Sequence, residues 1–139
     1  MYVYEHTLRV RYGDTDQMGY VYYGKYAYYY EQARAESIRA LGITYKQLEQ
    51  SGTMMPITRM NIRYIYPAQY DDLLTIRVTI PELPGRLITF RYEIYNENKR
   101  LINEGENQLI FLDAATRKPK RAPDELIKKL LPYFAGDVP

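Results

Sequence analysis

The segment from Tyr12 to Tyr30 reads YGDTDQMGYVYYGKYAYYY and joins a strand-like stretch to a helix-like stretch. It carries two aspartates, Asp14 and Asp16, and seven tyrosines in the eleven residues from Tyr20 to Tyr30. A helix start carries partial positive charge, and tyrosine supplies a large contact area with a polar tip, as is common at interfaces and pocket walls. We therefore expect this segment to organise both the fold and the site.

The sequence around this segment predicts an antiparallel sheet. Residues 2–12 alternate apolar and polar side chains, which is the period of a strand with one face in water. The same alternation recurs in three later segments, 59–66, 73–80 and 87–95, and a last strand is expected at about 101–112. The connections are too short for crossover helices, so neighbouring strands should pair antiparallel. Gly105 interrupts the last alternation, which predicts a β-bulge there.

Three helical segments complete the predicted fold, at about 24–41, 44–52 and 122–134, and Gly42 is placed to end the first. The whole chain, residues 1–139, reads as one domain. We predict an α+β fold, a five-stranded antiparallel sheet with one apolar face and one long helix to cover it. Because one helix cannot cover such a face fully, we expect an oligomer, with tyrosines at the contact.

Composition excludes several function classes. Lys and Arg number 19 against 17 Asp and Glu, a net charge of +2, which is too small for nonspecific nucleic-acid binding. The chain has no cysteine, so disulfides, thiolate nucleophiles and cysteine zinc sites are absent. The one histidine, His6, falls on the apolar side of the first strand and reads as structural. No apolar run is long enough to cross a membrane, and we expect a cytoplasmic protein.

The start of the predicted long helix, near Gly24, is the best candidate site. Unpaired amide N–H groups and the helix dipole favour an anion or a developing oxyanion there. Gly19 has no side chain to block a substrate. Asp14 or Asp16 could attack an acyl carbon or align a water molecule, but Asp also caps helices and stabilises turns. Residue spacing leaves these readings open and does not choose between the two aspartates.

The stretch RYGDTDQMGYVYYGKYAYYYEQAR resembles the opening of the 4-hydroxybenzoyl-CoA thioesterase-like family of hotdog-fold acyl-CoA thioesterases. The family pattern is Asp-x-Asp, two residues, Gly, several aromatics, and a helix with Glu and Ala-Arg. The stretch GTMMPITRMNIRYIYPAQYDDLLTIRV is also similar to the family, and the resemblance covers residues of about 10–112. It implies a curved five-stranded sheet wrapped around the long helix, and a homodimer or homotetramer with its active site at a subunit interface.

The resemblance also implies roles for individual residues. Asp16 would be the catalytic carboxylate, as a nucleophile or as a general base on water. The backbone N–H of Tyr23 would hold the thioester carbonyl, with Gly24 opening the helix, and Asp14 would only brace the loop. Relatives linked to the bacterial Tol-Pal system have His in place of Tyr23, so a step assigned to that imidazole is not available here. Glu31, on the helix, is the second-choice carboxylate.

Substrate contacts are expected from further residues. Gly19, Tyr22, Tyr26 and Met55 are predicted to line the acyl site, which could be an aryl pocket or an alkyl tunnel. The resemblance makes Arg86 a candidate for the phosphates of coenzyme A. Residues 117–121 carry four basic side chains and could also receive phosphate, although a solvated loop that joins a strand to a helix is the favoured reading of this run.

We therefore predict an acyl-CoA thioesterase that releases a free acid and CoA, with no metal and no cofactor apart from the CoA of its substrate. Nucleic acid and membrane are not expected partners. One alternative is a hotdog protein that binds an acyl thioester without hydrolysing it. Another is a dehydratase or hydratase, which would need a catalytic histidine near the helix, where His6 is poorly placed.

Overall fold

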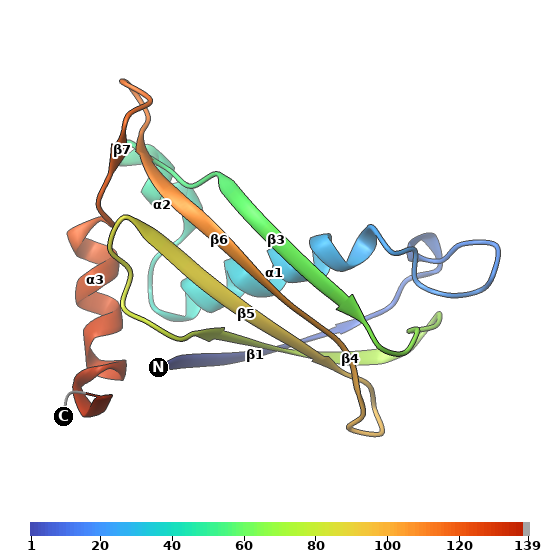
Figure 1. Cartoon of the computed structure of the whole chain (residues 1–139). Coiled ribbons are helices and arrows are strands. Elements are labelled where there is room, and N and C mark those ends of the chain that lie inside the picture. Colours follow the sequence, from blue (N-terminus) through green and yellow to red (C-terminus); the bar gives the residue numbers. More distant parts are fainter. Residues whose placement is uncertain (138–139) are drawn as a thin grey trace.

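The computed structural model describes residues 1–137 and shows an antiparallel sheet packed on one face against a long helix (Figure 1). The strands are β1 (Tyr2–Arg9), β2 (Thr53–Met54), β3 (Ile57–Tyr64), β4 (Leu73–Ile80), β5 (Leu87–Tyr95), β6 (Leu101–Asp113) and β7 (Pro119–Lys120). The helices are α1 (Lys25–Ala40), α2 (Tyr45–Gln50) and α3 (Asp124–Leu130), with single 3-10 turns η1 (Tyr12–Asp14), η2 (Leu131–Tyr133) and η3 (Ala135–Asp137). The predicted α+β class is confirmed.

The sheet has seven strands, so the predicted count of five is wrong. The long strands run in the order β1, β4, β5, β6 and β3, and each neighbouring pair is antiparallel. The two further strands, β2 and β7, pair with the last residues of β6 and have two residues each. Two residues are too few to show an alternation, which is why the sequence pattern missed them. Within the described chain, β3 pairs only with β6 and is an edge strand.

The hydrophobic core lies between α1 and the sheet, as the alternation predicted. The even-numbered residues of β4 and β5 point inward and are buried, from Leu74 to Ile80 and from Ile88 to Ile94. Helix α1 meets them with Tyr26, Tyr30 and Ala33, which share one helix face because they are spaced by four and three residues. The helix ends within one residue of its predicted bound.

The segments outside α1 agree with the sequence in outline and differ at their ends. Thr44 and Gln47 form a reciprocal capping pair at α2, with N–H to side-chain oxygen distances of 2.9 and 3.0 Å. The C-terminal α-helix stops at Leu130, before Pro132, whose ring and missing N–H interrupt an α-helix. Strand β1 stops at Arg9, short of the predicted residue 12, because the chain turns at η1.

Gly105 does not mark a bulge, so that prediction is wrong. It pairs in regular register with Tyr92 and with Ile62, and the register shifts lie elsewhere, at Ile57/Arg59 and Ile94/Tyr95. A Cβ at Gly105 would come within 2.6 Å of the Tyr30 ring. The glycine is therefore required by the close approach of this ring, and not by a backbone irregularity.

A row of buried polar groups runs under α1. The Tyr30 hydroxyl donates a hydrogen bond to Asn103 Oδ1, and the rings of Tyr30 and Tyr92 stack with centroids 4.2 Å apart. Arg34 Nη1 donates to the Tyr92 hydroxyl, which in turn donates to Asn107 Oδ1, each at 3.0 Å. Burial raises the pKa of both tyrosine hydroxyls above its ordinary value. These inward-facing asparagines explain why the alternation of β6 is blurred.

Candidate active site

The loop between β1 and α1 holds the Asp16 side chain through a local turn. The amide of Asp16 donates to the Tyr20 carbonyl at 2.9 Å, and the amide of Gly19 donates to the Asp16 carbonyl at 3.0 Å. Gly19 has a φ of +81°, where a side chain would be strained. Asp16 Oδ1 accepts from the Met18 amide at 2.9 Å, and Oδ2 has no hydrogen-bond partner within the described residues. One carboxylate oxygen is thus positioned and the other is open.

Asp14 is engaged differently from Asp16. Its Oδ2 accepts hydrogen bonds from the Tyr29 hydroxyl at 2.8 Å and from the Arg11 amide at 3.1 Å. Lys25 Nζ lies 3.8 Å from Oδ1. Burial and the Asp14 carboxylate together raise the pKa of Tyr29 well above its usual range. The Asp14 carboxylate ties the loop to α1 and fits a bracing role.

Asp16 opens onto a pocket of about 310 Å³ that we call the aromatic pocket. Its lining residues are Asp16, Met18, Tyr20, Val21, Tyr23, Tyr26, Tyr64, Ile65, Tyr66 and Pro67. Three predicted site residues, Asp16, Tyr23 and Tyr26, are therefore brought together. The aromatic walls and single carboxylate suit a planar or apolar group carrying one reactive polar centre.

The first turn of α1 begins beside this pocket. Gly24 is the N-cap residue, and the Lys25 amide is bonded to the Tyr22 carbonyl at 2.9 Å. The amides of Tyr23 and Gly24 have no hydrogen-bond acceptor among the described residues. With the helix dipole behind them, these two N–H groups are suited to an oxygen that carries negative charge. A Cβ at Gly24 would lie 2.8 Å from the Tyr22 ring, so glycine also allows this ring to fold back.

Four predicted substrate residues do not line the aromatic pocket. Gly19 shapes the loop, and Tyr22 is half exposed, with its ring centroid 4.5 Å from that of Tyr23. Met55 packs against the hydrophobic core. Arg86 lies in the turn between β4 and β5, whereas the 12–24 loop is at the opposite end of the molecule in Figure 1.

The sequence reasoning missed residues 64–67, which supply a wall of the aromatic pocket. Tyr64 ends β3, and its hydroxyl donates to the Tyr23 carbonyl at 3.1 Å. The Arg100 guanidinium lies 3.8 Å from the centre of the Tyr66 ring. The signal for this wall was the aromatic repeat in YIYP, which was assigned only to a strand end.

The two basic candidates lie together in the fold. The Ala122 amide donates to the Gly85 carbonyl at 2.7 Å, which joins the turn before Arg86 to the segment after Arg121. The side chains of Arg86 and Arg121 are exposed. Glu31, the second-choice carboxylate, is exposed on α1 and does not line the aromatic pocket.

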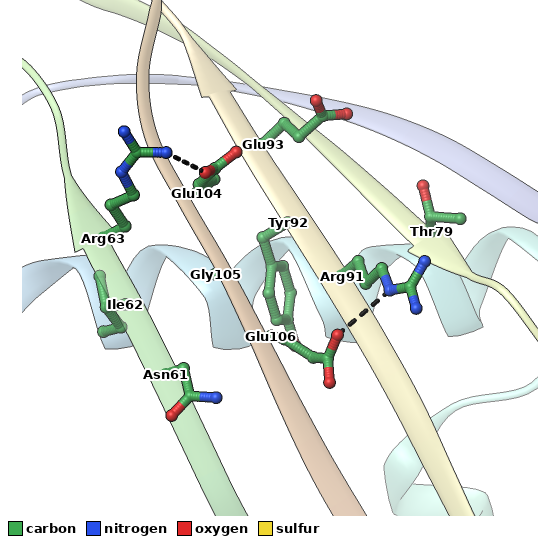
Figure 2. Close-up of a pocket in the computed structure, with 10 residues that line it drawn as sticks. All are labelled: Asn61, Ile62, Arg63, Thr79, Arg91, Tyr92, Glu93, Glu104, Gly105 and Glu106. Atoms are coloured by element: carbon green, nitrogen blue, oxygen red, sulfur yellow. Dashed lines mark hydrogen bonds and ion pairs between the residues drawn. The ribbon is translucent and has the colours of Figure 1, made fainter.

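A hollow of about 540 Å³ lies on the sheet face that points away from α1, above the missing side chain of Gly105 (Figure 2). Its rim is crossed by two ion pairs, Arg63 with Glu104 at 3.0 Å and Arg91 with Glu106 at 3.1 Å. The charges are paired and no predicted site residue lines it. We interpret this hollow as part of a solvent-exposed sheet face that is covered by paired charges.

His6 lies on the inward face of β1 and is half-buried, as expected of a structural residue. Its Nε2 has no hydrogen-bond partner among the described residues. Burial lowers the pKa of His6 below its ordinary value, and the nearby Glu36 opposes this shift. It does not line the aromatic pocket.

No helix in the described part of the chain is both long and apolar enough to cross a membrane.

Comparison with known proteins connects this chain to a family. Residues 10–130 match the model of the thioesterase-like superfamily. The chain is 32% identical over 120 residues to the acyl-CoA thioester hydrolase YbgC of Escherichia coli, covering 86% of this chain and 90% of that protein. It is 33% identical over 122 residues to the 1,4-dihydroxy-2-naphthoyl-CoA hydrolase of Thermosynechococcus vestitus, covering 84% and 81%.

A solved structure shows that the fold is also similar to that of a thioesterase. The DHNA-CoA thioesterase of Staphylococcus aureus superposes with a TM-score of 0.88 at 29% identity, covering 100% of this chain and 97% of that one. The antiparallel sheet packed against α1 agrees with the hotdog fold that the resemblance implied. The chain belongs to the thioesterase-like superfamily.

Proposed function

We propose that this protein hydrolyses acyl-CoA thioesters to a free acid and CoA, with Asp16 as the catalytic carboxylate. The observation that carries the proposal is that one aromatic cavity is lined both by Asp16, which has one open oxygen, and by Tyr23, whose amide has no acceptor among the described residues. The relatives named as acyl-CoA thioester hydrolases support the reaction class.

In this mechanism the thioester carbonyl oxygen accepts hydrogen bonds from the N–H groups of Tyr23 and Gly24. These donors are in place before the reaction and stabilise the charge that develops on the oxygen. Asp16 either attacks the carbonyl carbon, to form an anhydride that water then cleaves, or removes a proton from an attacking water. Both routes expel the CoA thiolate, which takes up a proton. Neither route uses a metal or a further cofactor.

The proposal includes a homodimer formed through β3. This edge strand has one side unpaired, and exposed edges of this kind pair readily with another strand. Its Tyr64 end lines the aromatic pocket, while its Ile57 end points toward the end of the molecule that carries β7 (Figure 1). Antiparallel pairing of two copies reverses the direction of the strand. The basic cluster of Arg86 and residues 117–121 in one subunit would then lie toward the aromatic pocket of the other.

This arrangement gives the CoA phosphates a place. Within one chain, the segments that carry the basic cluster lie at the opposite end of the fold from the loop that joins β1 to α1 and contains Asp16 (Figure 1). In the dimer, one subunit supplies the carboxylate and helix start, and its partner supplies the cations. We place the enzyme in the cytoplasm, where coenzyme A thioesters are made and used.

The deciding experiment measures thiol release from a panel of aromatic and aliphatic acyl-CoAs. We expect turnover by the wild type and a loss of kcat of at least about 100-fold in Asp16→Asn, the scale for a removed catalytic carboxylate. Glu31→Gln is the matched control and should keep wild-type kcat. Full activity in Asp16→Asn with loss in Glu31→Gln would transfer the role to Glu31. Binding of acyl-CoA by the wild type with no turnover across the panel would favour the non-catalytic alternative.

A mixing experiment tests the shared site. Asp16→Asn supplies an intact basic cluster, and the double variant Arg86→Ala/Arg121→Ala supplies an intact aromatic pocket. If subunits exchange and the site is shared, the mixture should regain part of the wild-type activity that each variant lacks. Activity equal to the sum of the separate variants, with subunit exchange verified by mass, would contradict a shared site.

A further inference from the structure

A second cavity, of about 760 Å³, lies between the end of β1, the start of α1 and the turn before β4. We call it the β1–α1 cavity. Its lining includes the charged and aromatic side chains of Arg9, Arg11, Tyr12, Lys25, Tyr28 and Tyr70. It shares no lining residue with the aromatic pocket, and its volume is within the range of small-molecule sites. The mechanism proposed above uses none of its open surface.

The charges in the β1–α1 cavity favour an anion. Three cations, Arg9, Arg11 and Lys25, face two carboxylates, Asp14 and Asp71. Arg9 lies 3.7 Å from Asp71, and Lys25 lies 3.8 Å from Asp14, but the Arg11 side chain has no ion pair among the described residues. The cavity therefore has one positive charge in excess. A second cation, Lys25, is held by its 3.8 Å contact to Asp14 and by the Tyr28 ring, whose centre lies 5.2 Å from Nζ. Two such groups suit the oxygens of a phosphate.

The same cavity exposes aromatic faces. Tyr12 is 78% exposed, Tyr28 is 65% exposed and Tyr70 is 56% exposed. Tyr12 and Tyr70 meet edge to face, with centroids 5.7 Å apart, so each keeps ring surface open to the cavity. Open tyrosine rings beside a charged groove are the arrangement on which nucleic-acid bases stack.

We propose that the β1–α1 cavity binds a nucleotide, with its base against Tyr12 or Tyr70 and its phosphate between Arg11 and Lys25. A planar ring joined to a phosphate satisfies both features at once, and neither an apolar ligand nor free phosphate does. The site does not depend on the Asp16 chemistry. It is nevertheless connected to that loop, because Asp14 accepts from Tyr29 and its carbonyl accepts from the Tyr22 amide at 2.8 Å.

The test is isothermal titration calorimetry of the full chain with AMP, and with adenosine and inorganic phosphate as the two halves of that probe. We expect AMP to bind more tightly than either half. Tyr12→Ala and Arg11→Ala should each weaken AMP binding at least about fivefold, the lower end for loss of a stacked base or a charged contact. Both side chains are exposed, and circular dichroism verifies that the variants fold.

Arg121→Ala is the matched control, because it removes an exposed cation of the basic cluster proposed for CoA. It should leave AMP affinity unchanged. AMP binding that is lost in Arg121→Ala but kept in Tyr12→Ala and Arg11→Ala would overturn the proposal and assign AMP to the CoA site. Absence of AMP binding by the wild type would also overturn the proposal. So would a change in the oligomer mass of Tyr12→Ala when the wild type does not bind AMP. A crystal structure with AMP at Tyr12 would support it, whatever the outcome for Asp16.

Discussion

The Tyr64 hydroxyl, at the end of β3, donates a hydrogen bond to the backbone carbonyl oxygen of Tyr23, 3.1 Å away. This contact fixes the peptide that follows Tyr23, and therefore the Gly24 amide, relative to the sheet. The edge strand thus holds the helix start in position beside Asp16.

Removing this contact tests the positioning role of Tyr64. We expect Tyr64→Phe to lower kcat for thioester hydrolysis about two- to tenfold, as loss of a hydrogen bond of about 0.5–1.5 kcal/mol predicts, with little change in KM. Tyr23→Phe is the control: it keeps the backbone donor and should retain wild-type kcat. A larger loss in Tyr23→Phe than in Tyr64→Phe would assign a role to the Tyr23 hydroxyl instead.

Substitution of the two loop aspartates should affect different properties, stability for Asp14 and activity for Asp16. Asp14→Asn weakens the contacts to Tyr29 and Lys25, so we expect a loss of about 0.5–1.5 kcal/mol in the free energy of unfolding. Asp16→Asn can still accept from the Met18 amide, so it should be almost as stable as the wild type while losing activity. Urea denaturation and thiol release measured on both variants verify this. The reverse pattern would exchange the two roles.

Gly105 should not tolerate a side chain. A Cβ there would lie 2.6 Å from the Tyr30 ring and 2.7 Å from the Asn61 carbonyl oxygen. We expect Gly105→Ala to lose about 1–3 kcal/mol in the free energy of unfolding, the usual cost of overpacking. Gly85→Ala has nothing within 4 Å of its Cβ and should be almost neutral. Equal stability of the two variants in urea denaturation would mean that the sheet relaxes freely at Gly105.

The buried polar row depends on the Tyr92 hydroxyl. Tyr92→Phe removes the acceptor of Arg34 Nη1 and the donor to Asn107, and both partners stay buried. Because a buried polar group left without a partner costs about 1–3 kcal/mol, we expect a loss of that size in urea denaturation. Tyr28→Phe, at a ring that is 65% exposed, is the control and should change stability little. A neutral Tyr92→Phe would show that water replaces the hydroxyl.

His6 should make stability depend on pH. Its folded-state pKa lies below the ordinary 6.5, so the unfolded chain binds the proton first as pH falls. The contribution of neutral His6 to the free energy of unfolding is therefore full above about pH 6.5, and it is lost as pH falls through the folded-state pKa. We expect wild-type stability to fall between about pH 7 and pH 5 more steeply than that of His6→Gln, measured by urea denaturation at each pH. Parallel curves would contradict this assignment.

The sequence predicted the parts of the fold that follow from a repeating pattern. Strands β1, β4 and β5 alternate because one face packs against the core, and α1 shows the spacing of a helix that packs on one side. The helix start at Gly24 had a local signal, whereas Asp16 was preferred to Asp14 only through the family resemblance, and the catalytic roles of both residues stay predictions. The segment 64–67 was missed as a pocket wall, since nothing in its own residues indicates which loop it will contact.

What the sequence determined by itself was the α+β class, the order of the long elements and the helix start, and it predicted the loop in which the site is proposed. Only the tertiary structure decided that Asp14 is engaged by Tyr29 while one oxygen of Asp16 stays open, and that Gly105 is needed beneath a ring from α1. Patterns along a chain report which face is buried. The contacts of a particular atom depend on residues far away in sequence, such as Tyr30 and Asn103, which only folding brings together.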